Sequence, residues 1–483
     1  MQMGVWISLS AYFLLMIAIG VYAWRKSTSN SEEYILGGRD LSPSVTALSA
    51  GASDMSGWLL LGLPGALFMA GLSQAWIGVG LVLGAWVNWL VVAPRLREQT
   101  ERYDNSLTIP GFLGNRFPSA ATALRMVSAV VIVVFFAVYT ASGLVGGGKL
   151  FASAFGGEYF TGIALTLGIV LVYTVIGGFL AVSLTDFVQG CIMMLALVIM
   201  PIVILTSDGG DGVGAAALRV TMADPEFLSL TKGMTLLGWI SAMAWGLGYF
   251  GQPHIIVRFM AIRSVADVPT ARRIGMSWMV VSLIGAIAVG IFGRAYALRT
   301  GLEVKDAETI FILLSDLLFH PLVTGFLYAA LLAAIMSTVS SQLLVASSSL
   351  TEDIYHSVLK RSASERELVT VSRLAVLAVG LVALIIASNP DSQVLGLVAN
   401  AWAGFGAAFG PLIILSLTWK RMTGAGAIAG LIAGTVTVIL WIALGLGGVV
   451  YEIVPGFIAA LVAIVAVSLA TADRGEFRQR QMA

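Results

Sequence analysis

The chain has 483 residues, of which 58% are hydrophobic and only 11% are charged. Soluble domains carry about 25% charged residues, so a chain with a mean hydropathy of +0.93 could not cover a water-facing surface. The net charge of +1 gives no indication of nucleic-acid binding, and the single cysteine, Cys191, excludes an internal disulfide. The composition therefore predicts an all-α polytopic membrane protein.

Thirteen apolar segments are long enough to cross the hydrocarbon core of a bilayer, which needs about 20 helical residues. Most of the 27 Lys and Arg residues lie in the connections after the odd-numbered segments. The positive-inside rule places these connections in the cytoplasm, so we expect the N-terminus outside and the C-terminus inside. The predicted spans are 5–24, 44–70, 74–94, 121–148, 160–177, 185–207, 233–253, 273–297, 321–351, 368–388, 394–418, 424–444 and 451–471.

Spans 2–6 and 7–11 form two groups of five, and each group opens with a glycine-rich interruption, GASDMSG (51–57) and WGLGYFGQP (245–253). Because five is odd, the second group would enter the bilayer from the opposite side. Inverted repeats with broken first helices are typical of secondary transporters, which bind their substrates at the breaks. This pattern divides the chain into an extra N-terminal helix with a cytoplasmic loop (1–40), a first repeat (41–207), an external loop (208–232), a second repeat (233–418) and two C-terminal helices with a short tail (419–483).

Asp54 is the single charged residue of a long apolar run around SAGASDMSG (49–57). A charge at the bilayer centre costs at least ~2.5–3.5 kcal/mol, so it needs compensation. Glycine and serine allow the helix to unwind, and the freed carbonyls of Ala52 and Met55 then become candidate cation ligands. The alternative is a structural aspartate that accepts bonds from neighbouring N–H and hydroxyl groups.

The span at 321–351 contains no charged residue, yet its second half is rich in Ser and Thr. Ala334, Ser337, Thr338 and Ser341 follow at i, i+3, i+4 and i+7, which places them on one face of a helix. Uncharged hydroxyl and carbonyl oxygens would suit a small monovalent cation that must bind and leave again. Spacing alone favours the alternative, in which the hydroxyls cross-link helices or bond to their own carbonyls.

The seventh span places Trp245, Tyr249 and Pro253 at four-residue steps on one face. Aromatic walls beside an opened backbone would suit a small amphipathic molecule, although such a stripe is more often packing. Tyr139 in the fourth span has the same two interpretations. His254 could relay protons, but an interfacial histidine is the simpler expectation. Asp186 follows GGFLAVSLT near an expected cytoplasmic helix start, where helix capping explains it.

No enzyme motif competes with these features. The chain has no P-loop, HExxH or GxSxG motif and no Cys/His metal cluster. We therefore expect a carrier driven by an ion gradient and not an enzyme. A channel or a solute sensor are the alternatives from other classes, but the chain offers neither rings of charge nor a signalling domain.

Several long stretches resemble the sodium:solute symporter family, and the resemblance runs over nearly the whole chain. It implies about thirteen helices on an inverted five-plus-five, leucine-transporter-type core. The likeness is strongest to the bacterial proline carriers, which implies sodium-coupled uptake of L-proline across the bacterial inner membrane. The densest stretches are YILGGRDL (34–41), TALSAGASDMSGWLLLGLPGA (46–66), GGFLAVSLTD (177–186), WGLGYFGQPHIIVRFMA (245–261), LAAIMSTVSSQLLV (332–345) and AWAGFGAAFGP (401–411).

The resemblance also implies roles for individual residues. Sodium would lie between spans 2 and 9, on the backbone oxygens of Ala52, Met55 and Ala334 and the hydroxyls of Ser337 and Thr338. Asp54 would support sodium binding, while Arg39 and Asp186 match positions linked to ion coupling on the cytoplasmic side. The main departures from the family pattern are at 298–320 and in the short C-terminal tail, away from these sites. The implied proline pocket consists of Ser56, Gly57, Tyr139, Trp245, Tyr249 and Pro253.

Two alternatives within the transporter class stay open. A proton could drive uptake through Asp54 or His254, and the substrate could be another small amino acid or carboxylate. The expected partners are L-proline, sodium and the lipid bilayer, with no nucleic acid and no obligatory protein partner.

Overall fold

The computed structural model describes residues 3–26, 30–207 and 212–472, and the short tail that follows lies outside the described residues. Within them the regular structure is helical, apart from an isolated bridge between Leu41 and Ile262, so the all-α prediction is confirmed. Ten of the described helices are long and apolar enough to cross a membrane. They are α1 (Met3–Lys26), α5 (Ala75–Arg102), α7 (Ala121–Phe155), the second part of α8 (Tyr159–Thr206), α12 (Val268–Thr300), α14 (Pro321–Ser348), α15 (Glu365–Ile386), α16 (Val394–Thr418), α17 (Gly424–Ala443) and α18 (Ile453–Thr471).

The other three predicted spans are short or interrupted helices. Span 44–70 consists of α3 (Pro43–Met55), the π turn η2 (Trp58–Gly62) and α4 (Leu63–Ala70). Span 160–177 is the first part of α8, which ends where Gly178 leaves the helical conformation with φ 59° and ψ −155°. Span 233–253 consists of α10 (Leu236–Met243), the 3₁₀ helix η5 (Ala244–Gly251) and α11 (Pro253–Ala261), so it continues past its predicted end.

Local sequence explains the two breaks. Ser56 follows α3 with φ 45° and ψ −170°, a conformation that a residue with a side chain adopts only at a cost. Gln252 precedes a proline, which disfavours the helical conformation, and its φ −82° and ψ 104° are extended. A close approach also requires glycine here, because a Cβ on Gly84 of α5 would lie 2.1 Å from the carbonyl oxygen of Gly246.

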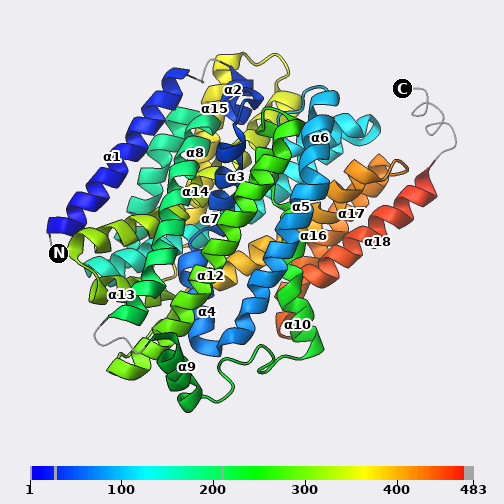
Figure 1. Ribbon diagram of the computed structural model, residues 1–483. Helices are drawn as coiled ribbons and strands as arrows, with labels where there is room; N and C mark the ends of the chain where they lie inside the picture. The colour runs from blue at the N-terminus through cyan, green and yellow to red at the C-terminus, as the bar shows by residue number, and fades with distance from the viewer. Residues whose placement is uncertain (1–2, 27–29, 208–211, 473–483) are drawn as a thin grey trace.

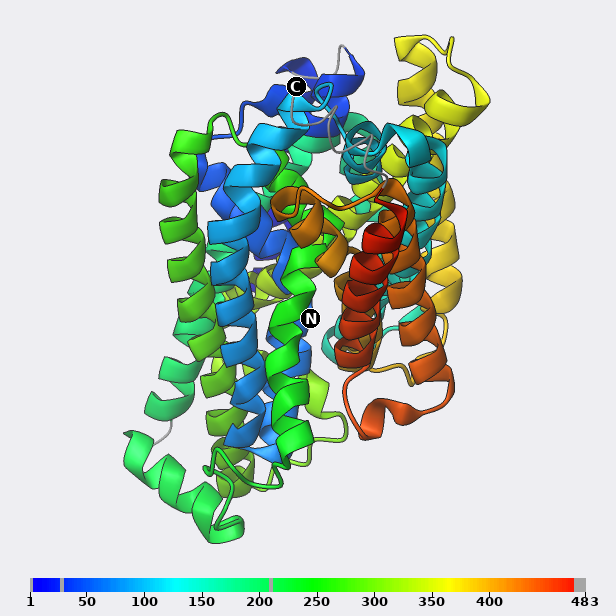
Figure 2. The ribbon, with the colours of Figure 1, turned by 90° about the vertical axis from the view of Figure 1, so that its right-hand side faces the viewer.

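The long helices run side by side, with α1 at one edge next to α8 and α14, and with α17 and α18 together at the opposite edge (Figures 1 and 2). Of the ten long helices, α14 is the most buried. Short elements cap the bundle or connect the long helices. These are α2 (Ser31–Leu36), η1 (Gly37–Arg39), η3 (Leu72–Gln74), α6 (Ile109–Arg116), η4 (Pro118–Ala120), α9 (Gly212–Ala223), η6 (Val265–Asp267), η7 (Ala307–Thr309), α13 (Ile310–Leu318), η8 (Ser349–Leu359) and η9 (Leu446–Gly448).

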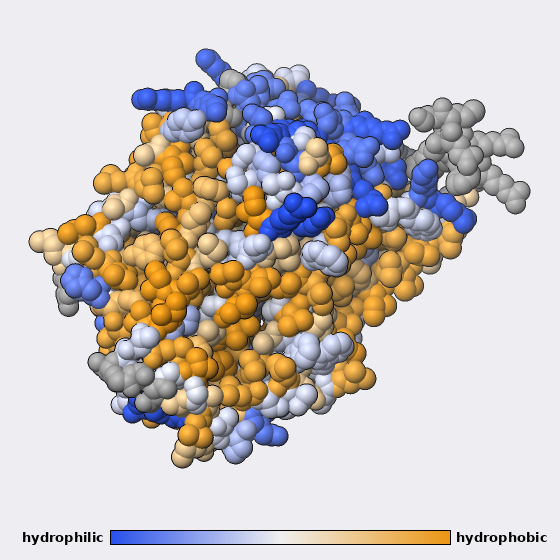
Figure 3. All heavy atoms as spheres, viewed as in Figure 1, coloured by the Kyte–Doolittle hydropathy of each residue, from blue (hydrophilic) through white to orange (hydrophobic). Residues whose placement is uncertain are grey.

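The surface of the bundle is divided by hydropathy. Figure 3 shows hydrophilic residues gathered at the end that carries α2 and α6, and a broad hydrophobic zone across the long helices. Apolar side chains such as Leu14 of α1, Ile284 of α12 and Ile385 of α15 are exposed on the long helices. Because such a surface is stable only against lipid, the chain is a multi-pass membrane protein.

Candidate functional site

Oxygen atoms from α3 and α14 converge at one point inside the bundle. The Ser337 hydroxyl donates to the carbonyl oxygens of Ala52 at 2.8 Å and Ala334 at 3.2 Å. The Thr338 hydroxyl lies 3.4 Å and 3.2 Å from the same two oxygens. All four residues are buried. We call this group the cation cage, after the sodium site that the sequence predicts at these residues. The hydroxyls bond across to α3 and back to their own helix, as the alternative interpretation also expects.

The cage lies at the break in α3. Met55, the fifth residue of the predicted sodium site, is the last residue of α3 and is buried. Ser56 and Gly57 follow at the break itself, and the Ser56 hydroxyl accepts a hydrogen bond from the Trp58 backbone N–H at 3.1 Å. The interruption predicted from GASDMSG is therefore observed, and it faces the hydroxyl-rich half of α14.

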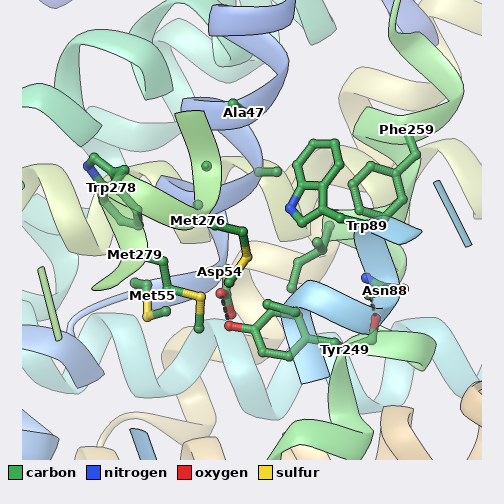
Figure 4. Close-up of a pocket in the computed structure, with 15 residues that line it drawn as sticks. Ala47, Asp54, Met55, Asn88, Trp89, Tyr249, Phe259, Met276, Trp278 and Met279 are labelled. Atoms are coloured by element: carbon green, nitrogen blue, oxygen red, sulfur yellow. Dashed lines mark hydrogen bonds between the residues drawn. The ribbon is translucent and has the colours of Figure 1, made fainter. Parts of the chain in front are cut away.

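Asp54 connects the cage to the aromatic residues. Its carboxylate accepts a hydrogen bond from the Tyr249 hydroxyl, as Figure 4 shows, and its backbone oxygen lies 3.3 Å from the Tyr139 hydroxyl. Two tyrosines from α7 and η5 thus bond to one residue of α3. The carboxylate bonds to Tyr249 and not to Ser337 or Thr338, so it is not itself one of the cage oxygens.

Two small cavities flank Asp54. One, of about 10 Å³, lies beside Asp54 and is walled mainly by aromatic and apolar side chains, namely Met55, Trp58, Leu81, Tyr139, Trp245, Val398 and Trp402. The second, of about 20 Å³, is bounded by α3, α5, α12 and the residues around the second break, including Tyr249 (Figure 4). The predicted pocket residues Tyr139 and Trp245 line the first cavity and Tyr249 the second. Ser56, Gly57 and Pro253 are buried at the helix breaks and line neither.

The aromatic wall contains tryptophans that no pattern in the sequence selects. The Trp58 ring stacks on Trp245 at 5.8 Å between centroids, and the Trp402 indole donates to the Trp245 carbonyl oxygen at 2.7 Å. The Trp402 ring also meets Tyr249 edge-on at 5.1 Å. Trp402 belongs to the stretch AWAGFGAAFGP, but only the packing of α16 against η5 reveals its place at the pocket.

The capping interpretation of Asp186 is wrong. Asp186 lies more than two turns past Gly178, inside the second part of α8, and its side chain is fully buried. Its Oδ2 atom accepts from the Ser49 hydroxyl at 2.8 Å, Arg258 at 3.1 Å and the Ser341 hydroxyl at 3.4 Å. A buried carboxylate needs such partners, and here they come from α3, α11 and α14.

The predicted end of the seventh span, at residue 253, is also wrong. It left Arg258 in the cytoplasmic connection that follows and His254 at the membrane interface. Both residues are fully buried, because the seventh span continues to Ala261 and does not end at Pro253. The His254 ring packs edge-on against Phe136 and Tyr139, so the interfacial interpretation is wrong. The uninterrupted apolar run around the arginine in HIIVRFMA was the available signal.

Arg39 lies apart from the cage. It is buried, and its guanidinium donates to Asn105 at 2.7 Å, Thr100 at 3.1 Å, Ser106 at 2.8 Å and Met260 at 2.8 Å. Burial lowers the pKa of Arg39 to about 10, so the side chain stays charged at neutral pH. These bonds tie the end of α5, the following loop and the end of α11 together.

The fold and this site are those of a secondary transporter, in which two interrupted helices and a hydroxyl-lined helix lie together beside a small pocket. The model of the sodium:solute symporter family matches residues 34–434, and the chain belongs to this family. Membership makes it a sodium-coupled solute transporter and not an enzyme.

Curated relatives cover almost the whole chain. The high-affinity proline transporter PutP of Bacillus subtilis (strain 168) is 58% identical over 456 residues, which are 94% of this chain and 96% of the relative. The osmoregulated proline transporter OpuE of the same strain is 53% identical over 98% of this chain and 96% of the relative. A sodium/proline symporter of Staphylococcus aureus (strain NCTC 8325 / PS 47) is 50% identical over 98% and 94%.

Two solved structures share the fold. A Na⁺-coupled sialic acid symporter in a substrate-bound outward-open state matches with a TM-score of 0.82 and 18% identity, over 98% of each chain. MHP1, a nucleobase-cation-symport-1 family transporter in a closed conformation, matches with a TM-score of 0.55 and 14% identity, over 92% of this chain and 95% of the other. At these identities the likeness concerns the fold alone.

Proposed function

We propose that the protein takes up L-proline together with sodium across the bacterial cytoplasmic membrane by alternating access. The choice of proline is supported by curated relatives that carry proline in their names and are 50–58% identical over nearly the whole chain. The observation that carries the coupling is the bond between the Ser337 hydroxyl and the Ala52 carbonyl. It places α14 against the break of α3, where an ion would control the neighbouring pocket.

In this proposal sodium binds first, on Ala52, Met55, Ala334, Ser337 and Thr338. The hydroxyl protons of Ser337 and Thr338 turn away from the carbonyls, so that their lone pairs face the cation. Filling the cage holds the broken part of α3 against α14. Because Tyr139 and Tyr249 both bond to Asp54, the same event sets the positions of these two pocket residues.

Proline then binds between the two helix breaks. Its ring would lie against Trp245, Tyr139 and Tyr249, while its carboxylate and ammonium groups would bond to backbone groups freed near Ser56, Gly57 and Pro253. Each ligand raises the affinity for the other by the same factor, as linkage requires. One sodium entering across 100 mV supplies ~2.3 kcal/mol, and a tenfold gradient adds roughly 1.4 kcal/mol. One sodium per proline is therefore sufficient for uptake against a steep gradient.

Arg39 and Asp186 support coupling in two different ways. We place Asp186, with Arg258, at the junction where α3, α8, α11 and α14 meet, on the cytoplasmic side of the cage. Arg39 joins the cytoplasmic ends of α5 and α11. Both would keep the helices that carry the breaks in register while the transporter changes conformation.

For topology we propose thirteen spans with the N-terminus outside and the C-terminus inside. The ten long helices and the three interrupted or short ones support this count, and the hydrophilic end near α2 and α6 supports the orientation (Figure 3). Residues 41–207 and 233–418 form the two inverted repeats, with 1–40 and 419–483 outside them and 208–232 between them. No obligatory protein partner is needed in this scheme.

The test is uptake of labelled proline by vesicles containing the purified chain, with and without an inward sodium gradient. We expect accumulation that requires sodium and is outcompeted by unlabelled proline. Uptake that ignores sodium and follows a pH jump would favour proton coupling through Asp54 or His254 instead. Uptake of a different small amino acid or carboxylate, without competition by proline, would show that this compound and not proline is the substrate.

A further inference from the structure

The helix α1 stands outside the proposed repeats, yet it contacts α14, which carries the cage hydroxyls, and α8, which packs against α3. It packs against α8 and α14 along the edge of the bundle (Figure 1). Tyr12, in the middle of α1, is buried, and its hydroxyl lies between these two helices. The hydroxyl accepts a hydrogen bond from the Gln189 amide at 2.8 Å and lies 3.6 Å from the Met336 sulfur, to which it donates.

On the α8 side, this contact leads to Ala52. Gln189 is fully buried one turn after Asp186, and among the described residues its Oε1 atom has no hydrogen-bond partner. The bond to the Tyr12 hydroxyl therefore fixes the position of the Gln189 side chain. The next residue, Gly190, packs against α3, since a Cβ built there would lie 3.5 Å from the Ala52 Cβ. Ala52 supplies the carbonyl oxygen that both cage hydroxyls approach.

On the α14 side, Met336 directly precedes Ser337. The Tyr12 hydroxyl thus bridges the segment of α8 that supports Ala52 and the segment of α14 that carries the cage hydroxyls. We propose that Tyr12 is a positioning residue for sodium, and that α1 sets the spacing of the cation cage through this hydroxyl. The inference rests on the proposed function for the identity of the ion.

The physical reason is the tolerance of an ion site. Ligand oxygens must be held within about 0.5 Å of the productive geometry by the residues behind them. Without the Tyr12 hydroxyl, the buried Gln189 amide loses its partner and must seek another, which shifts α8 at Gly190. That shift moves Ala52 relative to Ser337. The proline pocket shares the break of α3 with the cage, at Ser56 and Gly57, but the bonds of the Tyr12 hydroxyl go to Gln189 and Met336 and not to a pocket residue. At saturating sodium the cage stays filled, so the pocket should change little.

The test compares Tyr12→Phe with a matched control in vesicles containing the full chain. Tyr12→Phe keeps the ring and removes only the hydroxyl. Ser8→Ala is the control, because the Ser8 hydroxyl also bonds α1 to α14, at the Leu322 carbonyl (2.7 Å), but at the far end of α14 from the cage. Two quantities are measured, namely the sodium concentration that half-activates proline uptake and the equilibrium binding of sodium without proline.

We expect Tyr12→Phe to raise the half-activating sodium concentration and the sodium Kd by about three- to tenfold, the effect of losing one buried hydrogen bond. The proline KM at saturating sodium should change less than about twofold, and Ser8→Ala should change neither. Gln189→Met should reproduce the sodium shift, and the double variant should add nothing further, because both changes remove the same bond.

Unchanged sodium binding in Tyr12→Phe and Gln189→Met would overturn the inference. An equal shift in Ser8→Ala would overturn it as well, since the effect would then belong to the packing of α1 in general. If the wild-type protein showed no sodium-dependent proline uptake, that result would contradict the proposed function instead. In that case the sodium-binding measurement still decides the role of Tyr12.

Discussion

The hydroxyl of Ser337 donates a 2.8 Å hydrogen bond to the carbonyl oxygen of Ala52, a residue 285 positions earlier in the chain. The two residues belong to the interrupted helix α3 and to the most buried of the long helices, α14. Their contact joins the first proposed repeat to the second at the point where a charged ion can be surrounded by oxygens.

The cage hydroxyls should determine sodium affinity. Ser337→Ala and Thr338→Ala should each raise the half-activating sodium concentration about tenfold or more, because each removes an oxygen ligand from a buried site. The half-activating concentration is obtained by measuring proline uptake at a series of sodium concentrations, normalised to the amount of folded protein. Ser340→Ala is the matched control, since that hydroxyl bonds back to the Ser337 carbonyl of its own helix. A similar shift in the control would assign the effect to α14 packing.

Trp245 should determine proline affinity rather than sodium affinity. Its ring lies between Trp58 and Tyr451, with centroid distances of 5.8 Å and 5.2 Å. Trp245→Ala removes this wall and should raise the proline KM about tenfold or more, with a smaller change in sodium activation. Trp245→Phe should keep part of the affinity. Trp76→Phe, on the outer part of the bundle, should have no effect, and a larger sodium shift than proline shift in Trp245→Ala would contradict the assignment.

Asp54 should support sodium without replacing the cage ligands. Asp54→Asn keeps the size of the side chain but removes its charge, and it should weaken sodium activation by about tenfold or more, since charge-assisted bonds are roughly twice as strong as neutral ones. Tyr249→Phe, which removes the bond to the carboxylate, should shift sodium activation in the same direction by a smaller factor. The control is Asp40→Asn, at an exposed carboxylate. Wild-type sodium activation in Asp54→Asn would leave Asp54 as a structural residue only.

The Asp186–Arg258 pair should stabilise the folded protein as well as join α3, α8, α11 and α14. Both side chains are fully buried, and Arg258→Met leaves Asp186 without its cationic partner. Breaking a buried pair in this way typically costs about 3–5 kcal/mol. We expect a clear drop in the thermal midpoint of the purified protein in detergent. The double variant with Asp186→Leu should recover much of the loss, and a double variant less stable than Arg258→Met would show that the pair is not what the arginine stabilises.

Local patterns in the sequence were sufficient to predict the helices and their interruptions. Hydropathy over about 20 residues identified the helices, and the glycines and serines of GASDMSG and WGLGYFGQP identified the two breaks. Helical spacing placed Ala334, Ser337 and Thr338 on one face. Each of these features depends on residues close together in the chain, so it can be predicted without the tertiary structure.

Which of these features meet depends on the packing of the helices, which local patterns do not predict. The position of Arg258 beside Asp186, of Trp402 at the pocket and of Tyr12 behind the cage each depend on contacts between distant helices. In an apolar chain every helix presents hydrophobic residues to its neighbours, so periodicity does not select the partner. Buried polar groups help to select the partner, because a hydrogen bond or an opposite charge lowers the cost of burying them, and only the packed bundle shows where these bonds form.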